Sequence, residues 1–347
     1  MNIPVKILFS LLLITFLIVV GKKVLRMERA TYPMMVIFYV LVGFAFYPLL
    51  NGKMEVLSPF LLLSLGVVGF LEGAALDLAR LRARVDFRRP VIYFFPTLFF
   101  FFLVSWLLTR ALLPALALGL ALSLVSLYGV DEEKRAMVGL WEILGIPFLA
   151  IIFSLARGDF FTSLVYHLGL ALIFGAIAYI SLGIKATPGE VNALLLGLLL
   201  FSSGTSSFLL LSPIFVGFAS GLLYANLPKL VGTERMIPRL IPMEKPIFIF
   251  LLLYLGFTSF PYLTWKALGL ALLFFALKTL YGVVLGEKGF LSLSPLSVAM
   301  ILSFSVHFPQ HFPKQYLAAF SLVLLLLEAE EYLLGVREVR RKSYVRR

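Results

Sequence analysis

The amino-acid sequence predicts an all-α polytopic membrane protein with about 13 transmembrane helices. Hydrophobic residues make up 61% of its 347 residues, above the roughly 45–50% of an average soluble domain. They are gathered into runs long enough to cross the hydrocarbon core of a bilayer, which is about 30 Å thick. No polar stretch is long enough to form a separate soluble domain. We therefore expect one integral membrane domain.

Thirteen apolar segments, taken in chain order, give the predicted helices. They cover residues 4–20, 33–50, 57–76, 90–109, 111–128, 136–156, 161–183, 190–210, 212–226, 245–261, 264–286, 293–309 and 315–335. The first segment has the length of a signal peptide, but no small-residue cleavage site follows Val20. Because Gly21, Lys22 and Lys23 end it with positive charge, we interpret it as a helix.

The thirteen segments divide into six, one and six. A helix and its counterpart seven positions later have opposite orientations, so this division predicts two inverted six-helix repeats around a linker helix. The helices that begin at Pro33 and Pro213 agree with it, since each has proline in its first turn and continues to a glycine. The single transmembrane domain, 1–347, then comprises a first repeat (1–156), linker helix 7 (157–189), a second repeat (190–335) and a basic cytoplasmic tail (336–347).

Positive charge is distributed unevenly between the predicted loops. Of the 30 Lys and Arg residues, 23 lie in the odd-numbered connections and the C-terminal tail, and six lie on the other side. The positive-inside rule then places the C-terminus in the cytoplasm and the N-terminus outside, in the cell inner (plasma) membrane. The net charge of +12 reflects this topology and contact with anionic membrane lipids. It does not indicate a nucleic-acid partner.

Glu142 is the first candidate site residue, because it lies inside the apolar run from Ala136 to Ala156. It follows Arg135 by seven residues, which places it about 10 Å from the start of the helix. A carboxylate in the hydrocarbon costs about 3 kcal/mol on insertion scales and is by default a functional candidate. The alternative is a carboxylate that snorkels to the interface or hydrogen-bonds to a neighbouring helix.

Lys278 is the second candidate, nine residues before Glu287 and twelve after Lys266. It is about 13 Å from the cytoplasmic end of its helix, and its depth differs from that of Glu142 by about one helical turn. We predict that these two charges, one from each half of the chain, approach each other and bind an ion and protons, because pairing lowers the cost of burying them. The alternative is a permanent salt bridge that holds the halves together.

The histidines and the remaining polar residues give weaker signals. Glu72 is a candidate pathway acid, although snorkelling also explains it. His167 could sense pH, but a structural hydrogen bond is the interpretation that we favour. His307 and His311 are expected in an outer loop. The chain has no cysteine, no zinc or nucleotide motif and no Gly-x-Ser-x-Gly, so we expect no enzyme, no cofactor and no metal site.

Several stretches together resemble the cation/proton antiporter superfamily, especially its second branch, the Kef-type and related bacterial sodium/proton exchangers. The stretch 33–43 resembles the family's Pro-x-hydrophobic-x-Gly-Tyr-hydrophobic-x-x-Gly pattern. The stretch 73–82 is similar to its Gly-Leu-Glu-Leu-Asp-Leu helix end with a basic tail, and 217–223 to its Gly-Ala-Phe-x-Ala-Gly-Leu segment. Glu142 lies where the family has Asp-Asp or Asn-Asp, and Lys278 where many members carry lysine or arginine. The similarity extends over most of the chain, as in a divergent and compact member.

This resemblance implies that Glu142 is the ion- and proton-binding carboxylate and Lys278 its basic partner. It implies a core of predicted helices 4–6 and 11–13 that moves elevator-like against a dimerisation domain of helices 1–3 and 8–10. We therefore expect a homodimer. Trp141 replaces the family's first acid or amide, and Ser123 and Ser126 lie in a fifth helix without the family's Thr-Ser-Pro or Thr-Asp interruption. These three residues join Glu72 as candidate pathway residues.

The function expected from the sequence is secondary active transport that exchanges protons for a monovalent cation, Na⁺ or K⁺. One alternative is a transporter of the same fold for another solute, such as an organic anion. Another is a non-transporting membrane scaffold or regulatory homologue, which the altered fifth helix favours. The ion, the stoichiometry and the pH range are not specified by the sequence.

Overall fold

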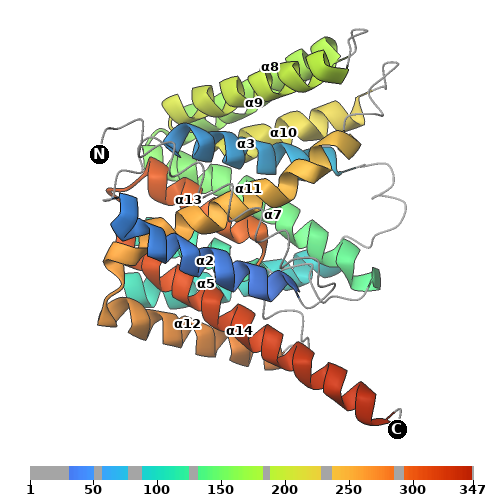
Figure 1. The fold of residues 1–347 in the computed structure, drawn as a ribbon. Coiled ribbons are helices and arrows are strands. Elements are labelled where there is room, and N and C mark those ends of the chain that lie inside the picture. The colour runs from blue at the N-terminus through green and yellow to red at the C-terminus, as the bar shows by residue number, and fades with distance from the viewer. Residues whose placement is uncertain are drawn as a thin grey trace. The chain divides into compact units, whose positions relative to one another are not determined.

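The computed structural model describes residues 31–50, 57–76, 88–124, 132–182, 188–227, 237–284 and 293–345. Within these ranges all regular structure is helical, with twelve α-helices, one short 3₁₀ helix and no strand (Figure 1). The elements are α2 (Thr31–Leu50), α3 (Ser58–Ala74), α5 (Arg88–Thr109), α6 (Leu112–Ser123), α7 (Glu132–Arg157), α8 (Phe160–Leu182), α9 (Pro188–Phe208), α10 (Pro213–Asn226), α11 (Ile237–Ser259), η3 (Phe260–Tyr262), α12 (Trp265–Val284), α13 (Pro295–His307) and α14 (Lys314–Val345). The all-α prediction is confirmed for this part of the chain.

The predicted apolar segments coincide with these α-helices, except that the first, 4–20, lies outside the described residues. Among the described residues, four helical stretches are long and apolar enough to cross a membrane: Pro90–Thr109, Phe160–Ser181, Glu244–Tyr262 and Trp265–Val284. Seven other apolar helical stretches of 10–17 residues lie in the described ranges. The structure therefore fits a membrane protein, but the prediction of about 13 full spans in two inverted repeats is wrong for the described residues. α6 and α13 are shorter than the spans predicted there, because the chain becomes extended at Leu124 and at Ser294.

The exposed side chains along one side of α8 are large and apolar. Phe161, Val165, Leu168 and Leu172 are all about half exposed or more. Their spacing of three or four residues places them on one side of the helix. A continuous exposed row of large apolar side chains is unfavourable in water and favourable in a bilayer. This face agrees with the predicted membrane location.

The described helices form two compact units. Unit 1 contains α2, the second half of α11, η3, α12 and α14. Unit 2 contains α3, α5 to α10, the first half of α11 and α13. Each unit has its own close helix contacts, and the two are described separately below.

In unit 2, α3 and α10 pack more extensively than any other pair of helices. The contact depends on glycines in both helices. A Cβ atom on Gly69 would overlap the backbone of Ile214, and one on Gly73 would overlap the carbonyl oxygen of Phe218. Conversely, a Cβ on Gly217 would overlap the carbonyl oxygen of Gly66. Small residues at such spacing let two membrane helices approach until their backbones touch.

Gly69→Ala is expected to destabilise the protein by about 1–3 kcal/mol, because the added methyl group meets rigid backbone and forces α3 and α10 apart. Gly197 of α9 is the matched control, since nothing lies within 4 Å of a Cβ built there. Gly197→Ala should stabilise by about 0.5–1 kcal/mol through helix propensity alone. Thermal unfolding in one detergent compares them, and equal midpoints for the two variants would contradict the close packing.

Unit 2 also contains two short helices that begin or end in its interior. The chain after α6 becomes extended at Leu124, with φ −76° and ψ 142°, and both Ser123 and Leu124 are fully buried. The chain before α13 is extended at Ser294, and Leu293 and Ser294 are buried as well. The two helices pack against each other. They therefore place one helix C-terminus and one helix N-terminus inside unit 2.

In unit 1, α12 lies beside α14, as Figure 1 shows. Ala267 of α12 packs with Ala318 and Ala319 of α14 in one small apolar cluster. α14 is the longest helix of the described chain, with 32 residues. The α2 helix joins this unit through Gly43, where a Cβ atom would overlap the carbonyl oxygen of Leu253 in α11.

Candidate functional site

Glu142 lies in α7, but its side chain is outside the part of the structure that is described. Gly145, three residues later in α7, has described contacts. A Cβ atom on Gly145 would lie 2.9 Å from the side chain of Leu124 and 3.4 Å from that of Met300. This level of α7 therefore contacts the residue that ends α6 and the middle of α13.

The C-terminus of α6 supplies backbone carbonyl groups at this level. Because the chain is extended at Leu124, the carbonyls of the last turn have no donors from a continuing helix. The Ser123 hydroxyl donates to one of them, the Leu120 carbonyl, at 2.8 Å. A helix C-terminus carries a partial negative charge, which favours cations. Ser126, the other predicted serine of this stretch, lies outside the described residues.

The N-terminus of α13 is built differently. Ser294 is its N-cap and accepts a hydrogen bond from the Leu296 N–H at 3.1 Å, and Pro295 occupies the first helical position. This end carries a partial positive charge. The α6 and α13 ends therefore bring opposite dipole ends into the interior of the same unit.

Two further features of α7 involve residues that lie near Glu142 in the sequence. Pro147 has no N–H, so the carbonyl of Ile143, next to Glu142, lacks its intrahelical donor. Trp141, predicted as a pathway residue, is fully buried and meets the Phe94 ring edge to face, with centroids 6.4 Å apart. It is therefore part of the contact between α7 and α5.

Buried hydroxyl groups occur on the helices of unit 2. The Oγ atoms of Ser105 on α5, Ser154 on α7, and Ser297 and Ser303 on α13 are buried, with no hydrogen-bond partner in the described part of the chain. Hydroxyl oxygens of this kind are suited to bind water or a cation. Sequence reasoning missed these four serines, because isolated serines in apolar segments do not reveal which face they occupy.

Glu72 lies near the end of α3, in unit 2, and is partly buried. Its electrostatic neighbour is Glu244 of α11, another carboxylate. The structure thus places the predicted acid beside a second acid. Within the described ranges, no group of three or more His, Cys, Asp or Glu side chains is arranged to hold a metal ion.

Lys278 is buried in unit 1, with 2% of its surface exposed. Its electrostatic partner there is Glu328 of α14, which is fully buried. Glu142 belongs to unit 2, so the predicted pairing of Lys278 with Glu142 stays a prediction. Sequence reasoning missed Glu328, although it follows an apolar stretch that begins at Tyr316. That uninterrupted run was the signal for a buried carboxylate.

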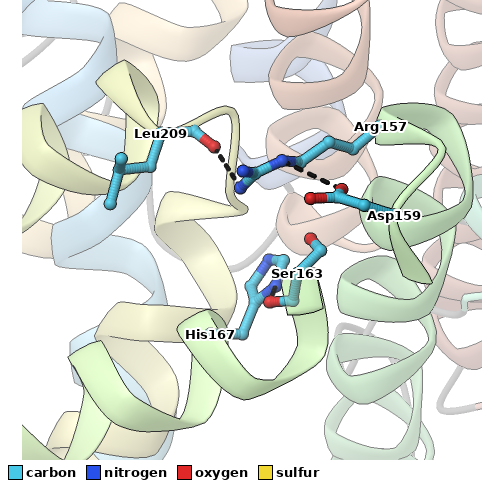
Figure 2. Close-up of polar contacts among 5 residues, drawn as sticks. All are labelled: Arg157, Asp159, Ser163, His167 and Leu209. Carbon is cyan, nitrogen blue, oxygen red and sulfur yellow. Dashed lines mark hydrogen bonds and ion pairs between the residues drawn. The ribbon is translucent and has the colours of Figure 1, made fainter. Parts of the chain in front are cut away.

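The α9–α10 turn is a second polar region of unit 2 (Figure 2). Arg157 donates from its Nη1 to the Leu209 carbonyl at 2.9 Å, and its Nε lies 3.0 Å from the Asp159 carboxylate. Leu210 has a φ of 55°, so it takes the left-handed position that usually ends a helix with glycine. The turn is therefore fixed by a helix-ending motif and by a charged side chain from outside it.

Two histidines hold the same turn. The Nε2 of His167 accepts from the Ser212 N–H at 2.8 Å, so the ring proton is on Nδ1, which donates to the Ser163 carbonyl at 2.9 Å (Figure 2). The structural role that we favoured for His167 agrees with this geometry. His307 is not in an outer loop as expected. It is the buried last residue of α13 and lies 3.0 Å from the Ser207 hydroxyl.

His167→Phe is expected to destabilise the protein by about 1–3 kcal/mol, because it fills the space but leaves the buried Ser212 N–H without an acceptor. His167→Gln is the matched control, since its amide oxygen can lie near the position of Nε2. Thermal unfolding of the purified variants measures the difference. Equal losses in both would assign the effect to ring packing instead of the hydrogen bond.

No protein-family model matches the chain, and no curated protein is similar enough to match it. The resemblance to the cation/proton antiporters is accordingly a hypothesis that rests on the residues of the chain.

Proposed function

We propose that the protein is a secondary active transporter that exchanges protons for a monovalent cation, Na⁺ or K⁺, across the cell inner membrane. The observation that carries the proposal is the contact of α7, at Gly145, with Leu124 at the buried end of α6 and with Met300 in the middle of α13, a short helix that also begins in the interior of unit 2. The resemblance to the antiporter superfamily supports it. A homodimer with elevator-like alternating access belongs to the same proposal.

The chemistry follows from what interrupted helices present. Transporters commonly bind substrates where discontinuous helices expose backbone dipoles inside the membrane, and helix C-termini coordinate cations there. A carboxylate at position 142 would complete such a site, because it binds either a cation or a proton. Both occupied forms are neutral, so either can cross the low-dielectric region, whereas the empty carboxylate is costly to move. Competition for one carboxylate couples the two flows.

The proposal is tested with purified protein in vesicles that carry an acidic interior and a trapped pH indicator. External Na⁺ or K⁺ should dissipate the gradient by driving proton efflux, and choline should not. The control is the same vesicles without protein. Failure of both cations in vesicles with inserted protein would contradict the proposal, and a gradient dissipated only by an organic anion would favour the alternative solute.

The topology that we propose has the N-terminus outside and the C-terminus in the cytoplasm, because 23 of the 30 basic residues lie on the C-terminal side. The native chain has no cysteine, so single introduced cysteines test it directly. An impermeant reagent applied to intact cells should label Lys266→Cys, at the exposed outer end of α12, and spare Arg341→Cys. The reverse labelling would show the opposite orientation.

A further inference from the structure

α12 buries one narrow face, and that face carries Lys278. Its buried residues are Ala267, Ala271, Phe274, Lys278 and Gly282. They are separated by three or four positions and therefore form one stripe along the helix. α12 packs chiefly against α14. The Lys278 ammonium thus belongs to the α12–α14 contact and not to the lipid-facing side of α12.

Two contacts fix the register of α12 and α14. Ala267 packs with Ala318, and Thr279 donates a hydrogen bond from its Oγ1 to a carboxylate oxygen of Glu330 at 3.1 Å. Both pairs have the same separation of 51 residues, so the two helices run parallel. The same separation places Lys278 level with Ala329, next to Glu328. This register explains the electrostatic interaction between Lys278 and Glu328.

The pair is buried on both sides, since Lys278 is 2% exposed and Glu328 is 0% exposed. Helix packing alone does not require such a pair, because well-packed apolar residues of similar size often stabilise a buried site equally well or better. Ionisable groups buried inside membrane helices instead mark ion and proton pathways. Function is therefore the better explanation for this pair.

A row of carboxylates continues from the pair along α14. Glu331 lies one turn beyond Glu328 on the same side of the helix. Glu330 and Glu331 are only partly buried, unlike Glu328. Acidic groups of decreasing burial can transfer protons stepwise between a buried site and the surface. Proton transfer along these acids would run toward the end of α14 that we propose to be cytoplasmic.

We propose that Lys278 and Glu328 form a second proton-exchange site, contained within unit 1. A monovalent cation binds the Glu328 carboxylate as the Lys278 ammonium releases one proton to the acids of α14. The ammonium becomes a neutral amine, and its N–H bond is the only covalent bond that breaks. The net charge of the site is zero before and after the exchange. Cation binding without proton release would leave an uncompensated charge in a low-dielectric site, which is strongly unfavourable.

This proposal rests on the proposed function, and equilibrium proton release separates the two. Na⁺ or K⁺ is added to purified protein in weakly buffered detergent, and a pH indicator measures the protons released per protein. Each site reports separately in this measurement, whereas flux needs the complete pathway. Because cation binding displaces bound protons, Glu142→Gln should still release about half as many protons as wild type.

The matched variant replaces the pair by apolar residues, Lys278→Met with Glu328→Leu, so that no buried charge is left alone. This double variant should lose the other half of the proton release, and combining it with Glu142→Gln should abolish proton release. Lys266→Met, on the exposed end of α12, should match wild type. Wild-type release from the folded apolar variant would overturn the proposal and leave a structural pair. Release that Glu142→Gln alone abolishes would also overturn it, and a wild type that releases nothing would overturn the proposed function itself.

Discussion

Glu142→Gln is expected to abolish proton-coupled Na⁺ or K⁺ flux in vesicles while the protein remains folded. Glutamine has nearly the size of glutamate, but it neither takes up a proton nor carries a negative charge. If position 142 is where cation and proton compete, no remaining interaction restores the coupling. The loss should be several orders of magnitude, as when a group essential to one step is removed.

The design separates chemistry from folding. Glu190→Gln, at an exposed position in the first turn of α9, removes an acid of the same type and should leave the flux unchanged. Glu142→Asp keeps a carboxylate on a shorter side chain and should retain part of the flux with a changed cation affinity. Unchanged flux in correctly inserted Glu142→Gln would remove this residue from the mechanism.

The second large effect is on stability. Glu328→Leu alone should cost about 3–5 kcal/mol, because it leaves the buried Lys278 ammonium without its carboxylate. Lys278→Met alone should cost a similar amount. The two together should be close to wild type, since replacing both charges by apolar side chains is often neutral or stabilising. Unfolding in detergent gives the three values, and additive losses would show that the two charges do not interact.

A second cycle tests the pairing first predicted from depth. Lys278→Ala is combined with Glu142→Gln, and the coupling energy is the part of the double effect that the single effects do not explain. Coupling of about 0.5 kcal/mol or more would show that these charges approach each other in at least one conformation. Independent effects would leave Glu328 as the partner that matters for Lys278.

The helices could be predicted because short polar stretches separate the apolar runs of the chain. In lipid, an apolar run of this length forms a helix, because a helix makes all its backbone hydrogen bonds within one segment. The helix ends that lie inside the fold could not be predicted. The segment 111–128 was predicted as one span, yet α6 ends at Ser123. Neither proline nor glycine lies between Ser123 and the end of that predicted span to indicate the break. α6 packs against α5 and α13. The sequence of one helix does not show which other helices pack against it, so this end could not be predicted.

The candidate site could be predicted only in part for the same reason: a single helix does not show its neighbours. The depth of Lys278 was readable from the length of apolar chain on each side, and it is buried as that depth suggests. Its neighbour was not, because depth along one helix does not identify which other helix lies beside it. Glu328 stands at a comparable distance from the start of α14. Only the shared register of α12 and α14, visible at Thr279 and Glu330, joins the two charges.

The length of α14 has a mechanical consequence. Its 32 residues make a rod of about 48 Å, which exceeds a hydrocarbon thickness of about 30 Å. Seventeen of them follow Glu328, so the rod extends about 26 Å beyond the buried carboxylate. A tilt of about 10° at that point would move the far end by about 4 Å. A change of charge too small to alter the packing around Lys278 would thus be amplified at the end of the helix, where the sequence carries Arg337, Arg340 and Arg341.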